Sequence, residues 1–397
     1  MKFLPLRGLH VLDMSKVLAG PLCAQYLGDM GADVIKIEAP EGGGDETRTW
    51  PPFRSTGTTH VGAIFISANR NKRSVVIDLT SVEGRKAVHR LAQQADVVIT
   101  SFGPGVAVKL GVDSKTLRAL NSRLVCCDIS GFGSVGSMQK GKGYDVILQA
   151  FCGMLSITGE TNGPPVRSPF SPVDQGTGLH ALIGILAALY KRERTGIGAV
   201  VEASLFDTAT GFLGYFLQNF WERGTEPVRP GSGHESLCPY QVFDTADKPL
   251  ILGVANDSLW QRFCALAGLD DICNDPRFAT NAARVQHRAE TLERVSAAMR
   301  KRQRAHWLQA LDAAGIPCSP LHTLGELCAH PHTHESGMVF EYEHPVLGKL
   351  GTVAQPIRFD GERMQVRRPA PMYGEHTREV LAELGYTEEE IAQIARC

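Results

Sequence analysis

The amino-terminal part of the chain alternates between short apolar strands and helices, and this alternation limits the fold more than any other feature. Residues 9–14 are a short apolar segment, a helix is expected over 20–30 because Pro21 suits a first helical turn, and residues 34–38 are the next apolar segment. Such a β-α-β unit requires parallel strands and a right-handed crossover. The same alternation continues as in a doubly wound α/β sheet, with strands expected at 74–79, 96–100 and 123–129 and helices at 82–94 and near 115–120.

The pattern becomes more helical after this region. Residues 144–153 and 178–193 are expected to form helices, and the second is apolar on nearly all faces, so it is expected to be buried. A Pro- and Gly-rich break at 225–236 is the first candidate boundary, and a second connection opens at His330. Residues 375–396 are expected to form two short amphipathic helices.

Composition excludes several classes of protein. The 397 residues carry 41 Lys and Arg against 42 Asp and Glu, a balance that argues against a general nucleic-acid or polybasic membrane binder. Ten cysteines without a CxxC pair predict neither a disulfide framework nor a zinc site, and the alternating His330, His332 and His334 are weak evidence for a metal. The start lacks the features of a signal peptide and the longest apolar run, 179–190, is too short to cross a bilayer, so a cytoplasmic protein is expected.

The turn after the first strand lacks the usual nucleotide fingerprints. Residues 15–21 read Ser-Lys-Val-Leu-Ala-Gly-Pro, which is neither GxGxxG nor a Walker motif. This argues against hydride and phosphoryl transfer. The helix that follows can still bind an anion at its amino terminus, and an ordinary strand-to-helix turn is the alternative.

A single acidic residue, Asp174, precedes Gly176, Gly178 and an apolar helix. The helix dipole favours an ionised carboxylate there, and the glycines would let a ligand approach backbone N–H groups able to stabilise an oxyanion. An ionised carboxylate so placed is a candidate nucleophile for acyl chemistry. A simple helix N-cap is the alternative.

Short motifs recur in order along the whole chain, at residues 11–13, 19–21, 27–38, 44–48, 71–74, 102–105, 143–145, 174–178, 186–190, 195–198, 314–318 and 368–371. Together they resemble the family III CoA-transferases, the CaiB–BaiF family. The resemblance implies that Asp174 attacks an acyl-CoA thioester to form a mixed anhydride, that CoA then forms an aspartyl-CoA thioester, and that an incoming carboxylate takes over the CoA. Coenzyme A is then a substrate, and no permanently bound cofactor and no metal are expected.

The resemblance also implies an architecture. We expect a doubly wound, Rossmann-like α/β large domain built from both chain ends, residues 1–202 and 351–397, and a smaller inserted α+β domain at 228–327. Residues 203–227 and 328–350 are the expected linkers. The family forms interlocked homodimers in which each chain threads through the other, and the two long connections are compatible with that.

Contacts with CoA carry over by position. Basic residues suit the phosphates and apolar residues suit the adenine, and the matching positions are Lys16, Val17, Leu18, Ala19, Ile77, Ser101, Phe102, Lys109, Leu110, Lys142 and Tyr144. The chain departs from the family pattern at Ser101, where an Asn commonly stands, at Thr80, where a Lys is common, and at Ala39 and Pro40, where a cation is often found.

The loop of Gly231, Ser232, Gly233 and His234 matches a glycine-rich loop that covers the active site in related transferases, and an interdomain linker is the alternative. A short dicarboxylate acceptor would need a cation beside the site, for which the candidates are Lys16, Arg48, Arg167 and His234. These residues favour a succinyl-CoA-type donor and a short dicarboxylic acid.

Two other functions remain open. The 2-methylacyl-CoA racemases share the fold but resemble this chain with His in place of Tyr144, and a tyrosine is a poor base near neutral pH, so Tyr144 favours transfer. The second alternative is an inactive CoA-binding protein, against which Asp174 argues.

Overall fold

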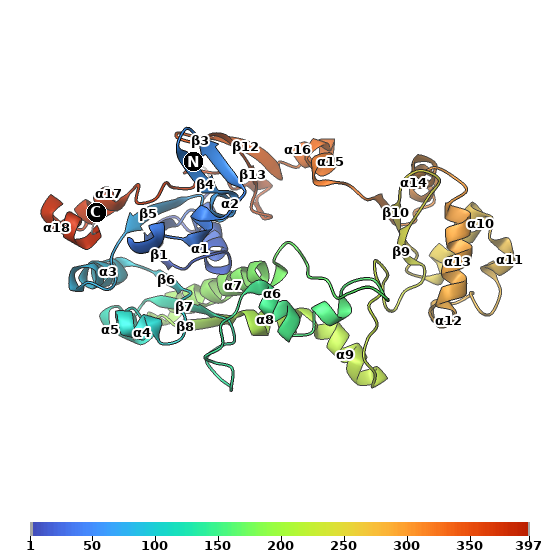
Figure 1. Ribbon diagram of the computed structural model, residues 1–397, viewed down its shortest axis with the longest axis horizontal. Helices are drawn as coiled ribbons and strands as arrows, with labels where there is room; N and C mark the ends of the chain where they lie inside the picture. The colour runs from blue at the N-terminus through green and yellow to red at the C-terminus, as the bar shows by residue number, and fades with distance from the viewer. Residues whose placement is uncertain (1–2, 396–397) are drawn as a thin grey trace. The chain divides into compact units, whose positions relative to one another are not determined.

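The computed structural model describes residues 3–395, which divide into two compact units (Figure 1). The smaller unit comprises Leu155–Arg167 and Phe220–His330, and the larger unit comprises the rest of the described chain. Among the described residues, no helix combines the length and the apolar character needed to cross a membrane.

A six-stranded parallel sheet forms the centre of the larger unit. The strands pair in the order β5-β2-β1-β6-β7-β8, and each pairing is parallel. Counted along the chain, this is the 3-2-1-4-5-6 order of doubly wound α/β folds, so the predicted parallel α/β sheet is confirmed. The strands are β1 (His10–Met14), β2 (Asp33–Glu38), β5 (Lys72–Val76), β6 (Val97–Thr100), β7 (Val125–Ser130) and β8 (Val200–Ser204).

Both faces of the sheet are covered by helices. Successive strand residues point to opposite faces, so Val11 and Val97 pack into one core cluster, and Leu12 and Val98 pack into another. The first cluster is closed by α1 (Ala19–Asp29), α6 (Asp145–Phe151), α7 (Pro172–Thr195) and α8 (Leu205–Phe212). The second is closed by α3 (Val82–Gln94), α4 (Val106–Leu110), α5 (Ser114–Leu120), α17 (Thr377–Glu383) and α18 (Glu388–Ala395).

Helix α7 differs from its sequence-based expectation in two respects. It begins at Pro172, six residues before Gly178, so Asp174 lies inside its first turn. Its last residue is Thr195, and Gly196 caps it in a left-handed conformation with φ of 71°. The prediction that this helix is buried on nearly all faces is wrong, because Leu179, Ile183 and Tyr190 are exposed on the side away from α1 and the sheet.

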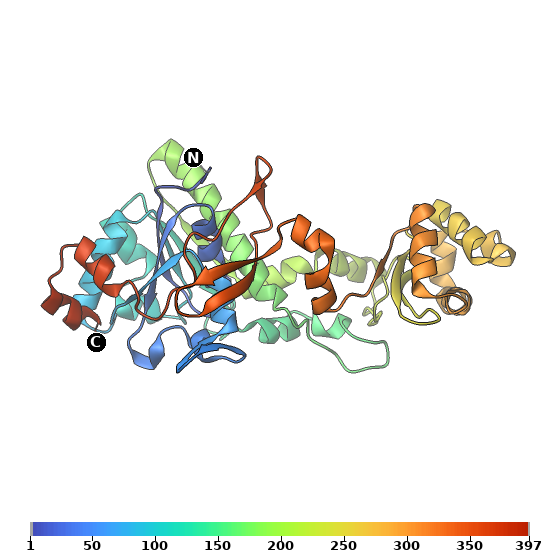
Figure 2. The same ribbon diagram turned by 90° about the horizontal axis from the view of Figure 1, so that it is seen from above.

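The carboxyl-terminal segment returns to the larger unit. In Figure 1 and Figure 2, α17 and α18 lie beside elements of the first third of the chain, and α17 contacts β5. The backbone N–H of Gly374 donates to the hydroxyl of Ser74 at 2.9 Å, and the hydroxyl of Tyr373 donates to the carbonyl of Ala39 at 2.9 Å. Both ends of the chain therefore build the same unit.

Smaller elements complete the larger unit. These are the helices α2 (Ala63–Ala68) and α16 (Pro331–Glu335), the 3-10 turns at Glu41–Gly43 and Glu46–Thr49, and the antiparallel pairs of β3 (Phe53–Thr56) with β4 (Thr59–Gly62), β12 (Val339–His344) with β13 (Gly348–Val353), and β14 (Arg358–Phe359) with β15 (Glu362–Arg363). The spans 203–227 and 328–350, expected as linkers, thus contain helices and strands, among them α9 (Gly214–Arg223). The domain boundaries themselves stay a prediction.

The smaller unit has its own core. Trp260, Phe263 and Trp307 are fully buried in it, and its sheet is antiparallel in the order β11-β10-β9. The buried guanidinium of Arg284 donates to the carbonyls of Cys238 and Phe278, both at 2.8 Å. The elements are β9 (Tyr240–Phe243), β10 (Leu250–Gly253), β11 (Cys318–Pro320), a 3-10 turn at Leu155–Ile157, and the helices α10 (Asp257–Ala267), α11 (Asp270–Cys273), α12 (Asn281–Gln286), α13 (Arg288–Met299), α14 (Arg304–Ala313) and α15 (Leu324–Ala329).

Candidate active site

A cleft of about 670 Å³ opens at the carboxyl ends of the central strands. Its walls include the loop that follows β1, the segment that follows β6, and the ends of β7 and β8. β1 and β6 are neighbours in the sheet, and the strand order reverses between them. This reversal is the place where open α/β sheets bind their ligands, so the cleft is the candidate site.

Nine of the residues expected at the site line this cleft. They come from the loop after β1 and the start of α1, the segment after β6, the segment that leads into α6, and the first turn of α7. They are Lys16, Val17, Leu18, Ala19, Ser101, Phe102, Lys142, Tyr144 and Asp174. Glu46, Asp128 and Glu202 also line the cleft, and sequence reasoning did not single them out.

The remaining expected site residues lie elsewhere. The side chain of Ile77 is fully buried in the core beneath α3, and Lys109 and Leu110, at the end of α4, do not line the cleft. Their contacts with CoA stay predictions.

The glycine-rich segment belongs to the smaller unit, where it is tied down by hydrogen bonds. The N–H of Gly231 donates to the carbonyl of Gly159 at 3.0 Å, and the N–H of Gly233 donates to the carbonyl of Pro230 at 2.9 Å. The N–H of His234 donates to the carbonyl of Tyr240 at 3.0 Å. The role of this segment as an active-site cover stays a prediction, as does a role for the exposed Arg167 in the same unit.

The loop after β1 has a fixed and unusual conformation. Val17 has a φ of 70°, in the left-handed region that β-branched residues rarely adopt. The backbone N–H of Lys16 donates to the hydroxyl of Ser101 at 3.0 Å, and the N–H of Val17 donates to the carboxylate of Asp45 at 3.4 Å. Ser101 therefore joins the two loops that meet at the strand-order reversal.

A buried cluster of four charged side chains lies beneath this loop. The ammonium group of Lys36 lies 3.0 Å from Asp45 and donates to the carbonyl of Ser15 at 2.9 Å. The ammonium group of Lys72 lies 2.8 Å from Asp13. Burial disfavours a charged lysine, but the carboxylates of Asp13 and Asp45 outweigh it and raise the pKa of Lys36, whereas burial lowers the pKa of Lys72 to about 8.

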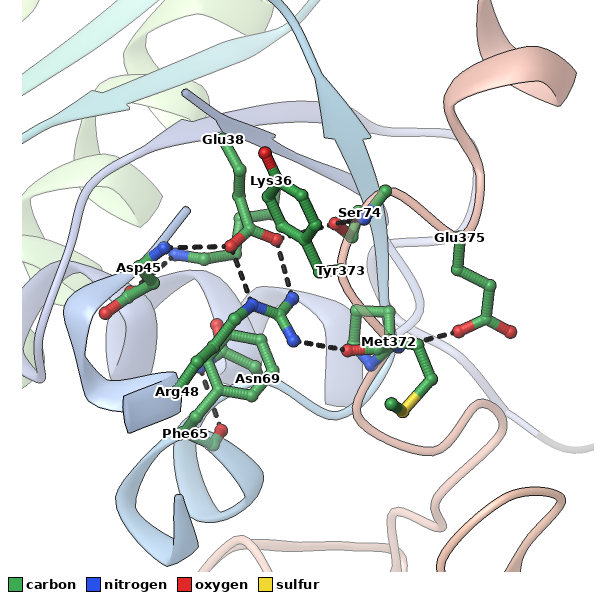
Figure 3. A network of polar contacts seen from close by, with 12 residues as sticks. Lys36, Glu38, Asp45, Arg48, Phe65, Asn69, Ser74, Met372, Tyr373 and Glu375 are labelled. Carbon is green, nitrogen blue, oxygen red and sulfur yellow. Dashed lines mark hydrogen bonds and ion pairs between the residues drawn. The ribbon is translucent and has the colours of Figure 1, made fainter. Parts of the chain in front are cut away.

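Arg48, a candidate acceptor cation, is already occupied by partners within the protein (Figure 3). Its guanidinium donates to both oxygens of Glu38, at 2.9 and 2.6 Å, and to the carbonyl of Pro371 at 3.1 Å. It also lies 3.6 Å from the ring centre of Phe65 and is 6% exposed. The expectation that Arg48 stands beside a substrate is wrong, because these contacts use it to join the first sheet strands to the returning chain end.

Asp174 lies in the first turn of α7 and is partly buried. Burial, and next the charge of Asp145, raise the pKa of Asp174 to about 7. Both effects oppose the ionised form that the helix dipole is expected to favour, and the contribution of the dipole stays a prediction. The N–H groups of Val173 and Asp174 donate to the carboxylate of Asp145, at 2.8 and 3.1 Å.

The glycines beside Asp174 serve helix packing. A Cβ on Gly176 would lie 2.3 Å from the Phe212 ring of α8, and a Cβ on Gly178 would lie 2.6 Å from the carbonyl oxygen of Ala19 in α1. The expected role of admitting a ligand to backbone N–H groups is replaced by close contact with two neighbouring helices.

Asp145 is a further residue beside the site to which the sequence analysis gave no role. It belongs to the Gly-Tyr-Asp motif at 143–145, in which only Tyr144 was assigned a role. Tyr144 is 53% exposed, whereas Asp145 is 6% exposed and bonded to α7. The signal available in the sequence was an acidic residue directly after Tyr144, an expected site residue. The N–H group that donates to Asp145 belongs to Val173, 28 residues further along the chain, so the sequence alone does not show this contact.

Comparisons with known proteins agree with this geometry. The family model for CoA-transferase family III matches residues 6–377. The succinate–glutarate CoA-transferase of Agrobacterium fabrum is 39% identical, covering 96% of each chain, and the succinyl-CoA:glutarate CoA-transferase of Homo sapiens is 33% identical, covering 98% of this chain and 88% of that one. A solved CaiB/BaiF family protein from Brucella suis is 36% identical with a TM-score of 0.84, covering 96% of this chain and 100% of that one. The chain belongs to family III of the CoA-transferases, the CaiB–BaiF family.

Proposed function

We propose that this CoA-transferase moves CoA from an acyl-CoA donor such as succinyl-CoA to a short dicarboxylic acid, with Asp174 as the nucleophile. The observation that carries the proposal is the position of Asp174 in the cleft at the strand-order reversal, with a pKa raised to about 7. Relatives are named for transfer involving glutarate, oxalate and mesaconate, each of which is a dicarboxylate.

The chemistry needs only a carboxylate and the two substrates. The ionised Asp174 attacks the thioester carbonyl carbon, the C–S bond breaks, and the CoA thiolate leaves a mixed anhydride behind. The thiolate attacks the aspartyl carbonyl and releases the first acid, which leaves CoA bound to Asp174 as a thioester. The acceptor carboxylate then displaces this thiolate to form a second anhydride. Attack of the thiolate on the acceptor's carbonyl yields the new acyl-CoA and restores the carboxylate.

The cleft offers suitable partners for both parts of CoA. Lys16 and Lys142 are exposed cations at its rim and can pair with phosphate groups. Val17, Leu18 and Phe102 provide apolar surface for the adenine. Lys16 also lies two residues after the end of β1, so it stands at the carboxyl edge of the sheet, where it can serve the second carboxylate of a dicarboxylic acid.

A transfer assay tests the proposal. The full-length protein is given succinyl-CoA or acetyl-CoA with glutarate, succinate, oxalate, mesaconate or a monocarboxylate of matched length, and the new thioester is identified by mass. We expect transfer to dicarboxylates, dependent on the acceptor, and a loss of at least about a thousandfold in D174N. Turnover of D174N above roughly a tenth of the wild-type rate would overturn the role of Asp174.

We also propose the interlocked homodimer of the family as the assembly. The exposed apolar side chains of Leu179, Ile183 and Tyr190 on α7 support it, because apolar stripes of this kind are typically covered by a partner. Light scattering on the purified protein tests it, with twice the chain mass of 43.1 kDa expected. A mass of one chain at micromolar concentration would contradict it.

A further inference from the structure

The carboxylate of Asp145 occupies the amino terminus of the helix that carries Asp174. The first N–H groups of a helix have no acceptor within the helix. Here Oδ2 of Asp145 accepts from the N–H of Val173 at 2.8 Å and from that of Asp174 at 3.1 Å. The N-cap residue of α7, Ser171, makes no side-chain cap. A carboxylate from α6 thus takes the place that a cap residue or an anionic ligand occupies in other helices.

The second oxygen of Asp145 is held as well. Oδ1 accepts from the side-chain amide of Gln149, one turn further along α6. The same amide group bonds to the backbone of Ser168, whose N–H lies 2.9 Å from Oε1 of Gln149. Asp145 is 6% exposed and Gln149 is 1% exposed. Gln149 therefore fixes the carboxylate of Asp145 against both α6 and the segment that leads into α7.

This arrangement acts on the charge of Asp174. Burial and the nearby negative charge of Asp145 both disfavour ionisation of Asp174. The other titratable groups that line the cleft are Lys16, Glu46, Asp128, Lys142, Tyr144 and Glu202. The first N–H groups of a helix normally stabilise the anion of an aspartate in the first turn. In α7 two of these N–H groups donate to the carboxylate of Asp145.

We propose that Asp145 is a positioning residue that holds the backbone of Asp174 in place and keeps its carboxylate basic for attack on the thioester. The inference rests on the proposed function, since it assigns a reason for the basicity of the proposed nucleophile. A more basic carboxylate donates its electron pair more readily, so the charge of Asp145 favours formation of the anhydride. Asp145 itself forms no bond with substrate in this scheme.

The variant D145N removes the negative charge. Its amide oxygen can still accept from α7, whereas its NH2 group replaces Oδ1 and cannot accept from Gln149, a loss that Q149A produces on its own. We expect the acidic limb of the pH profile of kcat/KM for acyl-CoA to move down by roughly one pH unit. D113N makes the same change in the N-cap of α5, where Asp113 accepts from the N–H of Thr116 at 3.1 Å, and its limb should coincide with that of the wild type. Partial unfolding would lower the amplitude of the profile without moving the limb.

A second variant keeps the charge and loosens the position. Q149A frees Oδ1 of Asp145, so kcat should fall while the acidic limb stays at the wild-type pH. A D145N limb that coincides with that of the wild type, or a Q149A limb that moves as far as that of D145N, would overturn the proposal. If D145N does not fold, Q149A decides: a kcat equal to that of the wild type would overturn the proposal, and a circular dichroism spectrum and unfolding midpoint equal to those of the wild type exclude partial unfolding as the cause of a lowered kcat. Failure of the proposed function is distinguishable, because D174N would then remain active.

Discussion

Gly178 of α7 lies directly against the carbonyl oxygen of Ala19, the first residue of α1: a Cβ at position 178 would be 2.6 Å from that oxygen. Ala19 also lines the cleft. The close approach of α7 to α1 therefore determines where the wall of the cleft stands, which connects a packing glycine to the binding of the substrate.

The variant G178A is expected to push the start of α1 away. Overpacking of this kind costs about 1 to 3 kcal/mol of unfolding free energy, and the displaced wall should raise KM for acyl-CoA more than it lowers kcat. Thermal unfolding and steady-state kinetics measure both effects. G211A is the matched control, because Gly211 in α8 has no atom within 4 Å of an added Cβ and alanine is the better helix former. Equal effects of the two variants would contradict the argument.

Trapping of the intermediate is the second prediction. Because Asp174 is the proposed point of attachment, incubation with succinyl-CoA followed by hydroxylamine or borohydride should modify one acidic residue, in the peptide that contains Asp174. Peptide mass spectrometry locates the modification, and D174N treated in the same way is the control. Modification of a cysteine or serine in the wild-type protein would place the chemistry elsewhere.

The strands and helices of the sheet could be predicted from the sequence because the residues that specify each of them are neighbours in the chain. Apolar strand segments and Pro21 at a helix start specify their own conformations, and the parallel order follows from β-α-β connections. The environment of Asp174 could not be predicted in this way. Its pKa depends on Asp145, which lies 29 residues earlier and reaches it only after α6 and α7 pack together. The same holds for Arg48, whose partner carbonyl at Pro371 is 323 residues away.

The pH dependence of stability is the third prediction. Folding raises the pKa of Asp174 from 3.8 to about 7, so the folded protein binds this proton more tightly than the unfolded chain does. The free energy of unfolding therefore falls as pH rises from about 4 to 7. Above pH 7 the folded protein carries the full free-energy cost of ionising the buried Asp174. D174N lacks the penalty and should be more stable than the wild type at pH 8 by about 2 to 4 kcal/mol, with a smaller difference at pH 5.

D113N is the control for this measurement, because its stability at pH 8 should change in the opposite direction to that of D174N. Burial opposes ionisation of Asp113, but the hydrogen bonds from Thr116 and neighbouring backbone groups together outweigh it and lower the pKa of Asp113, so its ionised form stabilises α5 above the ordinary carboxyl pKa. D113N should therefore lose stability at pH 8, by about 1 kcal/mol as is usual for a helix cap. Denaturant unfolding at both pH values checks the two variants. A D174N variant that is less stable than the wild type at pH 8 would contradict the raised pKa.

The buried cluster beneath the cleft gives the fourth prediction. K36M removes a cation that pairs with Asp45 and bonds to the carbonyl of Ser15, and it leaves a buried carboxylate without compensation. We expect a loss of about 3 to 5 kcal/mol in unfolding free energy and a higher KM for acyl-CoA. The double variant K36M/D45N should recover part of the stability, because it no longer buries the unpaired charge. K349M is the control, since Lys349 and Glu341 form an exposed pair whose loss should cost less than about 1 kcal/mol.

The last prediction separates CoA transfer from racemisation. A 2-methylacyl-CoA racemase removes the α-proton and needs acid/base groups on both faces of the α-carbon, whereas transfer changes only the carbonyl carbon. Asp174, with its pKa near 7, would suit either reaction, so the second group decides. That group is a tyrosine here: Tyr144 lines the cleft at the position where the family resemblance implies a histidine in the racemases, and a phenol is a weak base at neutral pH. We therefore expect a chiral 2-methylacyl-CoA incubated in heavy water without an acceptor acid to gain no deuterium at the α-carbon. Addition of glutarate should start CoA transfer under the same conditions, and Y144H is the variant most able to introduce exchange. Rapid deuteration by the wild-type protein in the absence of an acceptor would replace the transferase assignment with a racemase.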